Sequence, residues 1–225
     1  MELMISNDIL ELAKNVSHFT IAGEGNVSIR DGDTFLIKAS GSTLETMTNK
    51  DLVRCDLDGN ALKGEEKKPS MEVSFHAWIL KTFPEINCVC HTHPTNTIKV
   101  LCSGRIHDFA NKRLFPDQVV RNGTVSCVVP YATPGAPLRE EIKKSVEEFI
   151  GRNGCFPKLI LLKNHGIITA SASIQEATVS TLMCEKSAEI YIGAKMLNII
   201  QFLTPEEVAA VDTNPSEKYR RELYK

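Results

Sequence analysis

Residues 69–94 read PSMEVSFHAWILKTFPEINCVCHTHP. Apolar side chains recur at helical spacing from Met71 to Phe83, and Pro84 ends that helix. The next apolar stretch, CVCH, is short enough for a strand, and Pro94 then opens a second helical stretch, PTNTIKVLC. Helix, strand and helix in close succession are typical of a layered α/β protein.

On the N-terminal side, the sequence predicts one helix and two hairpins. The helix is expected to start with Asn7 as its N-cap and to end near His18. VSIR and TFLIK flank Asp31-Gly32-Asp33, and LVRCDLDGNALKG repeats the pattern around Asp58-Gly59. Hairpins join antiparallel strands, so a doubly wound parallel sheet is not expected.

On the C-terminal side, we predict strands at 124–129, 159–162 and 167–170, with helices at 138–150 and 174–197. The stretch 103–122 lacks clear periodicity and is expected to be a long irregular connection, a kind of segment that is often functional. The charged residues 214–225 are expected to be peripheral unless they reach a neighbouring subunit. We expect a single domain over residues 1–225, of the α/β class, with a mixed and largely antiparallel sheet.

Composition restricts the possible functions. The chain is 42% hydrophobic and 24% charged, which is typical of a globular protein with a packed core. A net charge of -2 gives no basic field for nucleic acid, so we expect no nucleic-acid partner. We also expect no membrane partner, since no apolar run is long enough to span a bilayer, and the acidic N-terminus suggests a cytoplasmic protein.

Three histidines are candidate metal ligands. His91 and His93 are two residues apart at a strand end, so both imidazoles can face one point. His165, in the turn Asn164-His165-Gly166 between two apolar strands, is the best remaining histidine for a third ligand of a catalytic zinc site. The alternative is that all three are separate polar residues at strand ends.

Cys88 and Cys90 lie beside the histidine pair, and their C-x-C spacing could also bind metal. No second closely spaced cysteine pair exists to complete a four-thiolate site. Seven scattered cysteines, mostly in apolar runs, are instead expected to be reduced core thiols.

Glu72, at the start of the helix that precedes the histidine pair, is a candidate catalytic base. It could also be a first-turn acid that the helix dipole favours. The loops GEGNVS (23–28) and ASGS (39–42) combine glycine with small polar residues and could present N–H groups to a phosphate, or they could be plain turns.

Taken in order, five motifs resemble the class II aldolase/adducin family, to which L-fuculose-1-phosphate aldolase belongs. The resemblance extends from about Ile9 to Leu197, and the motifs are GNVSIR, KASGSTLE, residues 69–94, VPYATPGAPL and LLKNHGIITA. It implies a three-layer α/β/α sandwich, usually assembled as a homotetramer with active sites between subunits. It also implies a Zn2+ cofactor bound by His91, His93 and His165, with Glu72 as the catalytic acid. The phosphate-cradling positions are implied to be Asn26, Ser40, Gly41 and Ser70.

The function that this resemblance implies is that of a zinc-dependent aldolase of carbohydrate metabolism. It would cleave a sugar phosphate, a ketose phosphate, by retro-aldol chemistry through a metal-stabilised enediolate. Alternatives on the same metal site are a pentulose-phosphate 4-epimerase, a sugar-acid-phosphate decarboxylase and a dehydratase. A non-catalytic binding module like the adducin head is a further alternative, which the presence of all three histidines and Glu72 disfavours.

The sequence departs from the family pattern in two places. Met71 stands where sugar-phosphate aldolases typically have a second serine, which removes one hydroxyl from the expected phosphate site. The stretch GRIHDFANKRLFPDQVV does not reproduce the segment that carries a tyrosine proton donor from the neighbouring subunit. His107, Asp108 and Asp117 are the titratable candidates there.

Overall fold

One seven-stranded sheet forms the centre of the computed structural model, which describes residues 2–198 and 200–223. The strand order is β3-β2-β1-β4-β7-β6-β5, and every neighbouring pair is antiparallel except β5 and β6. The predicted mixed, largely antiparallel sheet is therefore confirmed. The strands are β1 (Asn26–Asp31), β2 (Thr34–Lys38), β3 (Leu52–Asp56), β4 (Cys88–Thr92), β5 (Cys127–Val129), β6 (Ile160–Leu162) and β7 (Gly166–Ser171).

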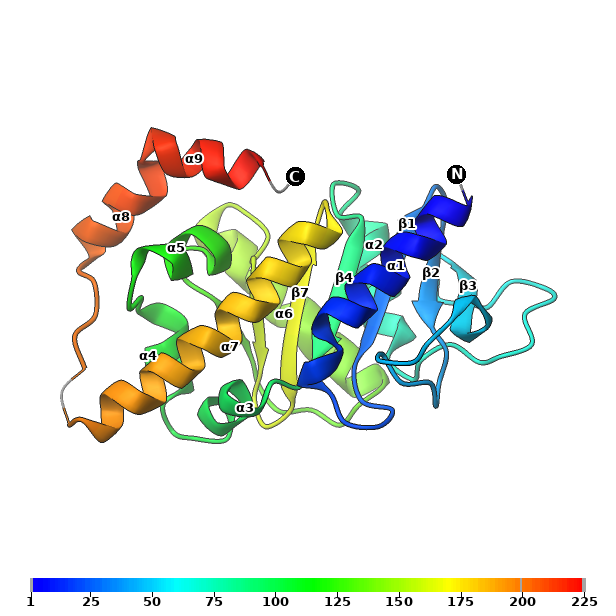
Figure 1. Cartoon of the computed structure of the whole chain (residues 1–225), viewed down its shortest axis with the longest axis horizontal. Coiled ribbons are helices and arrows are strands. Elements are labelled where there is room, and N and C mark those ends of the chain that lie inside the picture. The colour runs from blue at the N-terminus through cyan, green and yellow to red at the C-terminus, as the bar shows by residue number, and fades with distance from the viewer. Residues whose placement is uncertain (1, 199, 224–225) are drawn as a thin grey trace.

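Helices cover both faces of the sheet, as Figure 1 shows. Helices α1 (Glu2–Val16) and α7 (Ile174–Met196) pack side by side on one face, and α2 (Val73–Thr82) and α6 (Ala136–Asn153) pack together on the other. The result is the expected three-layer α/β/α sandwich. The remaining helical segments are η1 (Ser17–Phe19), η2 (Asn49–Asp51), α3 (Thr95–Leu101), α4 (Ile106–Asn111), α5 (Pro116–Asn122), α8 (Pro205–Thr213) and α9 (Pro215–Glu222).

Strand alternation divides the core between the two faces. Phe35 and Ile37 of β2 pack in the cluster that holds α2 and α6, while Leu36 between them packs in the cluster that holds α1. Successive side chains of a strand point to opposite faces, so both faces of β2 are apolar and both are covered. Full burial of each such side chain is worth about 1.5 to 3 kcal/mol.

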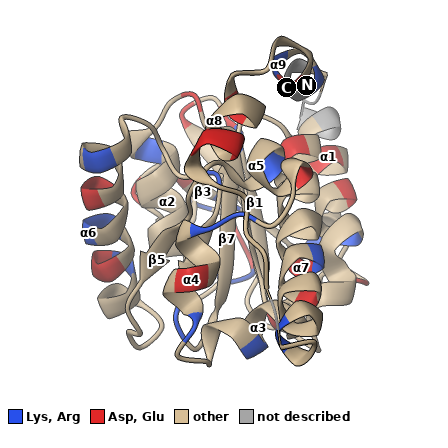
Figure 2. Ribbon diagram, turned by 90° about the vertical axis from the view of Figure 1, so that its left-hand side faces the viewer, with Lys and Arg blue, Asp and Glu red and all other residues tan. Residues whose placement is uncertain are grey.

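Helix α6 is amphipathic as its sequence predicts. Its buried side chains include Leu138, Ile142, Val146 and Phe149, which face the sheet. Figure 2 shows acidic and basic residues alternating along the side of α6 away from the sheet. The apolar stripe fixes which face of this helix lies inward.

Three details of the sequence interpretation are wrong. Helix α1 starts at Glu2, before Asn7, and the segment after β3 forms only an isolated bridge between Cys55 and Ala61. Residues 103–122 are not irregular, because they contain α4 and α5. Helices of six and seven residues contain too few turns to show a period in the sequence.

The C-terminal segment is helical and is anchored to the rest of the chain. Thr204 and Glu207 form a capping box at the start of α8. Asp117 of α5 pairs with Arg220 of α9 at 3.1 Å, which fixes α9 against α5. A search of the described residues for a helix of membrane-spanning length and hydrophobicity finds none. All seven cysteines are free thiols, five of them buried.

Strand pairing also determines where the functional groups meet. In the register of β4 with β7, His91 lies opposite Ile168 and Thr92 opposite Ile167. In the register of β4 with β1, His91 lies opposite Asn26. The end of β4 and the beginnings of β1 and β7 therefore lie at one edge of the sheet, although about 140 residues separate Asn26 from Gly166 along the chain.

Candidate metal centre and active site

The three predicted histidines converge at this edge of the sheet. His91 is the fourth residue of β4, His93 follows the strand, and His165 directly precedes β7. One nitrogen from each ring lies within 4.8 Å of the other two, and the Nε2 atoms of His91 and His93 are 3.0 Å apart. Two nitrogens bound to one tetrahedral zinc ion at ~2.0 to 2.1 Å lie about 3.3 Å apart, close to this spacing.

The protonation of the rings also fits a metal. Nδ1–H of His91 donates to the carbonyl oxygen of Ile167 over 2.8 Å, which leaves the lone pair on Nε2. Burial and then repulsion from His91 lower the pKa of His93 to about 3, and burial also lowers the pKa of His165. Nδ1 of His165 is buried and has no hydrogen-bond partner. Neutral imidazoles are nitrogen donors that suit zinc.

Gly166 is needed for this convergence. A Cβ atom at this position would lie 2.5 Å from Cδ2 of His93 and 2.5 Å from the carbonyl oxygen of Thr92. Real Cβ atoms do not approach other atoms that closely, so any side chain would displace the His93 ring or the end of β4. The glycine after His165 allows the two histidine segments to lie in contact.

Glu72 lies beside the histidines. It occupies the N-cap position of α2, but its carboxylate makes no capping hydrogen bond. Oε2 is 3.3 Å from Nε2 of His91, and Oε1 is 3.5 Å from Nε2 of His165. Burial raises the pKa of Glu72, yet attraction to His91 and a hydrogen bond from Asn26 outweigh this effect and lower the pKa below its ordinary value. The carboxylate is thus directed at the histidine cluster and does not act as a helix cap.

A buried set of polar side chains adjoins Glu72. Nδ2 of Asn26 donates to Oε2 of Glu72 over 2.8 Å, and Oδ1 of Asn26 lies 2.5 Å from Nε2 of His76. Oγ of Ser28 lies 2.7 Å from Nδ1 of the same histidine. Burial lowers the pKa of His76 to about 3, so this imidazole is neutral near pH 7.

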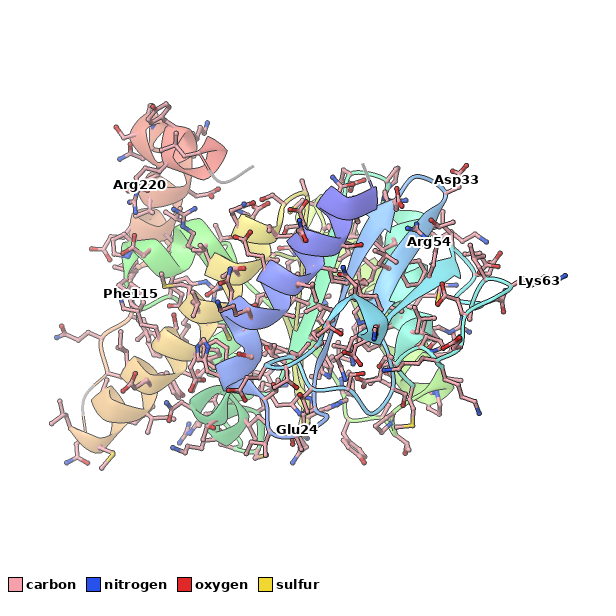
Figure 3. The ribbon with its side chains drawn as sticks, turned by 45° about the vertical axis from the view of Figure 1, so that its right-hand side comes forward. Glu24, Asp33, Arg54, Lys63, Phe115 and Arg220 are labelled. Atoms are coloured by element: carbon pink, nitrogen blue, oxygen red, sulfur yellow. The ribbon has the colours of Figure 1, made fainter. Side chains whose placement is uncertain are left out.

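A cavity of about 280 Å³ opens onto these groups. It contains Glu72 together with His93 and His165, and it also holds all four predicted phosphate-binding positions. Its lining residues are Gly23, Glu24, Gly25, Asn26, Lys38, Ser40, Gly41, Ser70, Met71, Glu72, His93, Pro134 and His165. Figure 3 shows Glu24 at the lower edge of the molecule, in the loop that leads into β1.

Comparison with known proteins identifies the family of the chain. The family model for the Class II Aldolase and Adducin N-terminal domain matches residues 10–192. The chain belongs to this family.

Among its relatives, a 3-oxo-tetronate 4-phosphate decarboxylase of Haemophilus influenzae is 30% identical over 192 residues, which cover 84% of this chain and 86% of the relative. An L-fuculose phosphate aldolase of Methanococcus maripaludis is 30% identical over 173 residues, which cover 76% of this chain and 86% of that relative. A solved L-fuculose 1-phosphate aldolase shares the fold with a TM-score of 0.80 at 24% identity, covering 96% of each chain. Relatives named for two reaction types are therefore equally identical to this chain, at 30%.

Two further residues line the cavity that the sequence interpretation did not include among the site residues. Lys38 is buried at the end of β2, and its Nζ donates to the carbonyl oxygens of Gly23 and Ser42. Burial lowers its pKa, and Glu72 and Asp51 partly offset this effect. The sequence feature that could have identified Lys38 is its place at the end of the mostly apolar strand TFLIK, directly before ASGS.

Glu24 is the second such residue. Its side chain is 46% exposed, and Oε2 lies 3.7 Å from Nδ1 of His93. The same oxygen accepts the backbone N–H of Ile21 over 3.0 Å, which fixes the loop. An acid between two glycines in GEGN could have been weighed as a site residue from the sequence alone.

Met71 lines the cavity and is 78% exposed. Its side chain therefore faces the cavity and is not part of the core.

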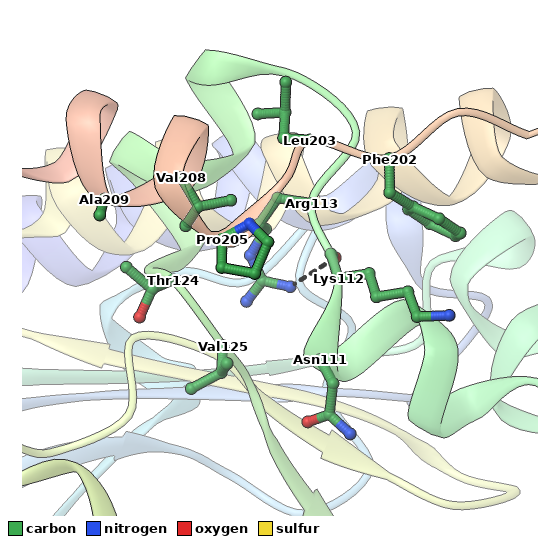
Figure 4. Close-up of a pocket in the computed structure, with 10 residues that line it drawn as sticks. All are labelled: Asn111, Lys112, Arg113, Thr124, Val125, Phe202, Leu203, Pro205, Val208 and Ala209. Carbon is green, nitrogen blue, oxygen red and sulfur yellow. Dashed lines mark hydrogen bonds between the residues drawn. The ribbon is translucent and has the colours of Figure 1, made fainter.

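The three predicted acid–base candidates of α4 and α5 lie elsewhere in this chain. Asp108 pairs with Lys112, Asp117 pairs with Arg220, and His107 lines a separate cavity with Arg152. A larger apolar cavity of about 540 Å³, shown in Figure 4, lies between residues 111–113 and the segment that leads into α8. Buried Arg113 lies at its wall and donates to backbone carbonyl oxygens there. None of the three candidates enters the histidine cavity of its own chain.

Proposed function

We propose that this chain is a zinc-dependent aldolase that cleaves a ketose phosphate by retro-aldol chemistry. The observation that supports it most is that Glu72, His93 and His165 share one cavity with Ser40, Gly41 and Ser70, while buried His91 lies 3.3 Å from Glu72 at its base. A metal-ligand cluster, a carboxylate and a set of small polar groups are the parts that such a reaction needs in one place.

His91, His93 and His165 would hold the zinc ion, and their three nitrogens leave a further coordination position open. When bound, the ion supplies Lewis-acid polarisation of substrate oxygen atoms. Asn26 holds one carboxylate oxygen of Glu72, while the other oxygen, Oε1, has no hydrogen-bond partner. Oε1 is thus the oxygen available for proton transfer.

In cleavage, a C–C bond of the ketose phosphate breaks and its electron pair stays on the ketone half. Glu72 then delivers a proton to the carbon that carries this pair, and in the reverse direction it removes that proton. The hydroxyl of the other half loses its proton to a second base and becomes the aldehyde oxygen.

We assign the second base to none of the groups that line the histidine cavity. Since His107, Asp108 and Asp117 lie outside the cavity of their own chain, we propose that a neighbouring subunit supplies the group in a homotetramer. Light scattering should give four chains per particle. An active monomer would contradict this part of the proposal.

Lys38 supports a phosphorylated substrate. Its ammonium group is the buried cation of the cavity wall, next to Ser40 and Gly41, and a cation there attracts a phosphate. Asn26, Ser40, Gly41 and Ser70 remain our proposed phosphate-binding residues.

A sugar-acid-phosphate decarboxylase is the second candidate, since the Haemophilus influenzae relative bears that name. Its substrate class carries a carboxylate as well as a phosphate. Glu24 places a carboxylate beside His93, in the cavity where the substrate carboxylate would bind. Like charges repel at this range, which favours the uncharged reacting end of a ketose phosphate.

The decisive experiment compares the two reactions in the zinc-loaded protein. Aldehyde release from a panel of ketose phosphates and CO2 release from oxo-acid phosphates should be measured side by side. We expect aldehyde release, and we expect Glu24→Gln to increase any residual CO2 release. Faster CO2 release by the unmodified protein would show that the decarboxylase assignment is correct.

A further inference from the structure

Two pairs of side chains interlock beneath the proposed active site. Asn26 and Ser28 are two residues apart on β1, so both point to the same face of the sheet. Glu72 and His76 are four residues apart at the start of α2, so both lie on the same face of the helix. The strand pair meets the helix pair through three hydrogen bonds of 2.5 to 2.8 Å.

The directions of these hydrogen bonds follow from the chemistry of the groups. An ionised carboxylate only accepts, so the amide nitrogen of Asn26 must face Glu72 and its oxygen must face His76. That oxygen also only accepts, so Nε2 of the neutral His76 carries the proton. Nδ1 is then an acceptor, and the hydroxyl of Ser28 donates to it. Each donor therefore points along the chain toward the carboxylate.

All four side chains of this hydrogen-bond series are shielded from water. Ser28 and His76 are fully buried, and Asn26 and Glu72 are nearly so. Hydrogen bonds in such surroundings are electrostatically stronger than in water, and successive bonds polarise one another. A series of hydrogen bonds of this kind fixes the position of its last acceptor, Oε2 of Glu72, and leaves Oε1 without a hydrogen bond.

We propose that His76 is a positioning residue that holds Asn26 in the orientation that fixes Glu72 for proton transfer. The inference rests on the role proposed above for Glu72. His76 touches neither the substrate nor a metal ligand in this scheme, and it acts only through the amide of Asn26. Ser28 sets the tautomer of His76 and so lies at the start of the chain.

Three variants test the proposal. His76→Leu removes the donor, whereas His76→Gln keeps an N–H near the position of Nε2, and His18→Leu is a control at an exposed histidine outside the site. For the ketose phosphate that the unmodified protein cleaves best, kcat of His76→Leu should fall about tenfold to a hundredfold. His76→Gln should recover most of kcat, and His18→Leu should match the unmodified protein.

A structural role alone would predict a different outcome. If His76 only stabilised the fold, His76→Leu would lower the melting temperature and leave kcat per folded molecule unchanged. In a Glu72→Gln background, His76→Leu should cause no further loss of kcat, because it acts through the missing carboxylate. A full additional loss in that background would overturn the proposal.

The tautomer of His76 can be measured without any substrate. Long-range 1H–15N correlation spectra of the zinc-loaded protein, assigned with His76→Gln, should show a proton on Nε2 and none on Nδ1. A proton on Nδ1 would overturn the hydrogen-bond chain whatever reaction the protein catalyses. If no ketose phosphate is cleaved while the Nε2–H tautomer is present, the proposed function fails and the hydrogen-bond chain stands.

Discussion

Asn26 lies opposite His91 in the register of β1 and β4, and its amide nitrogen donates to Glu72 over 2.8 Å. One strand residue thus connects the strand that carries His91 to the helix that begins at Glu72. The backbone pairing fixes where Asn26 lies relative to His91, and the side chain fixes where Glu72 lies relative to both. A substitution in this region can therefore be tested separately for metal content and for turnover.

Replacement of His91, His93 or His165 by alanine should deplete bound zinc, because each removes one nitrogen from a three-ligand site. The unmodified protein should contain about one zinc ion per chain by elemental analysis. His76→Ala should keep its zinc, since His76 lies outside the cluster. Full occupancy in the His165 variant would show that the third ligand is another residue.

Gly166→Ala should weaken zinc binding without removing a ligand. The new methyl group would meet the His93 ring and the carbonyl oxygen of Thr92 at 2.5 Å, so one of them must move. We expect at least a tenfold loss of affinity in a competition titration with a chelator. Gly151→Ala is the control, since a Cβ there meets nothing within 4 Å and alanine suits a helix. Equal affinity in both variants would contradict the close approach at Gly166.

Glu72→Gln should keep the zinc and the fold and lose most of kcat. The amide has the size of the carboxylate but cannot carry the proton. Zinc content, circular dichroism and the rate of aldehyde release should be measured on the same sample. A kcat near that of the unmodified protein would disprove the role of Glu72.

Met71→Ser should tighten the binding of phosphorylated substrates. The side chain lines the cavity and is exposed, and a hydroxyl can donate a hydrogen bond that a thioether cannot. A hydrogen bond to a charged group is worth about 1.5 to 3 kcal/mol, or roughly tenfold to a hundredfold in affinity. The ratio of kcat/KM for a ketose phosphate to that for the free ketose should rise accordingly. An unchanged ratio would place Met71 outside the phosphate contact.

Asp51→Asn should lower stability in a pH-dependent way. A hydrogen bond from Lys67, together with others from Thr48 and Ser42, holds the pKa of Asp51 well below its ordinary value. A depressed pKa stabilises the folded state fully above the unfolded pKa of about 3.9, and this effect is lost progressively as the pH falls from there toward the lower pKa of the folded state. Urea unfolding should show a difference of up to about 1 kcal/mol at pH 7 that shrinks toward pH 3. A difference independent of pH would mean that the charge is not responsible.

Much of the site could be predicted from the sequence because its residues lie in local motifs. His91 and His93 are two apart on one strand, and Glu72 immediately precedes a helix that ends at a proline. The periodicity of apolar residues and the prolines that end helices reveal such features in the sequence. The predicted layers of the fold are confirmed for the same reason.

The parts that could not be predicted depend on contacts between distant segments. Lys38 becomes a cavity residue only because the loop at Gly23 and the turn at Ser42 both present carbonyl oxygens to its Nζ. His76 appears in the sequence as one polar residue in an apolar helix, and only the pairing with β1 shows what it contacts. Helices α4 and α5 are too short for periodicity to be visible.

The pairing of β4 with β7 brings together proposed zinc ligands that are more than seventy residues apart in the chain. During synthesis, His91 and His93 leave the ribosome well before His165, and strand β7 must dock before the third nitrogen is in place. A pair of imidazoles alone binds zinc more weakly than the complete set. Acquisition of the metal is therefore expected to be a late event in biosynthesis, after strand β7 has paired with β4.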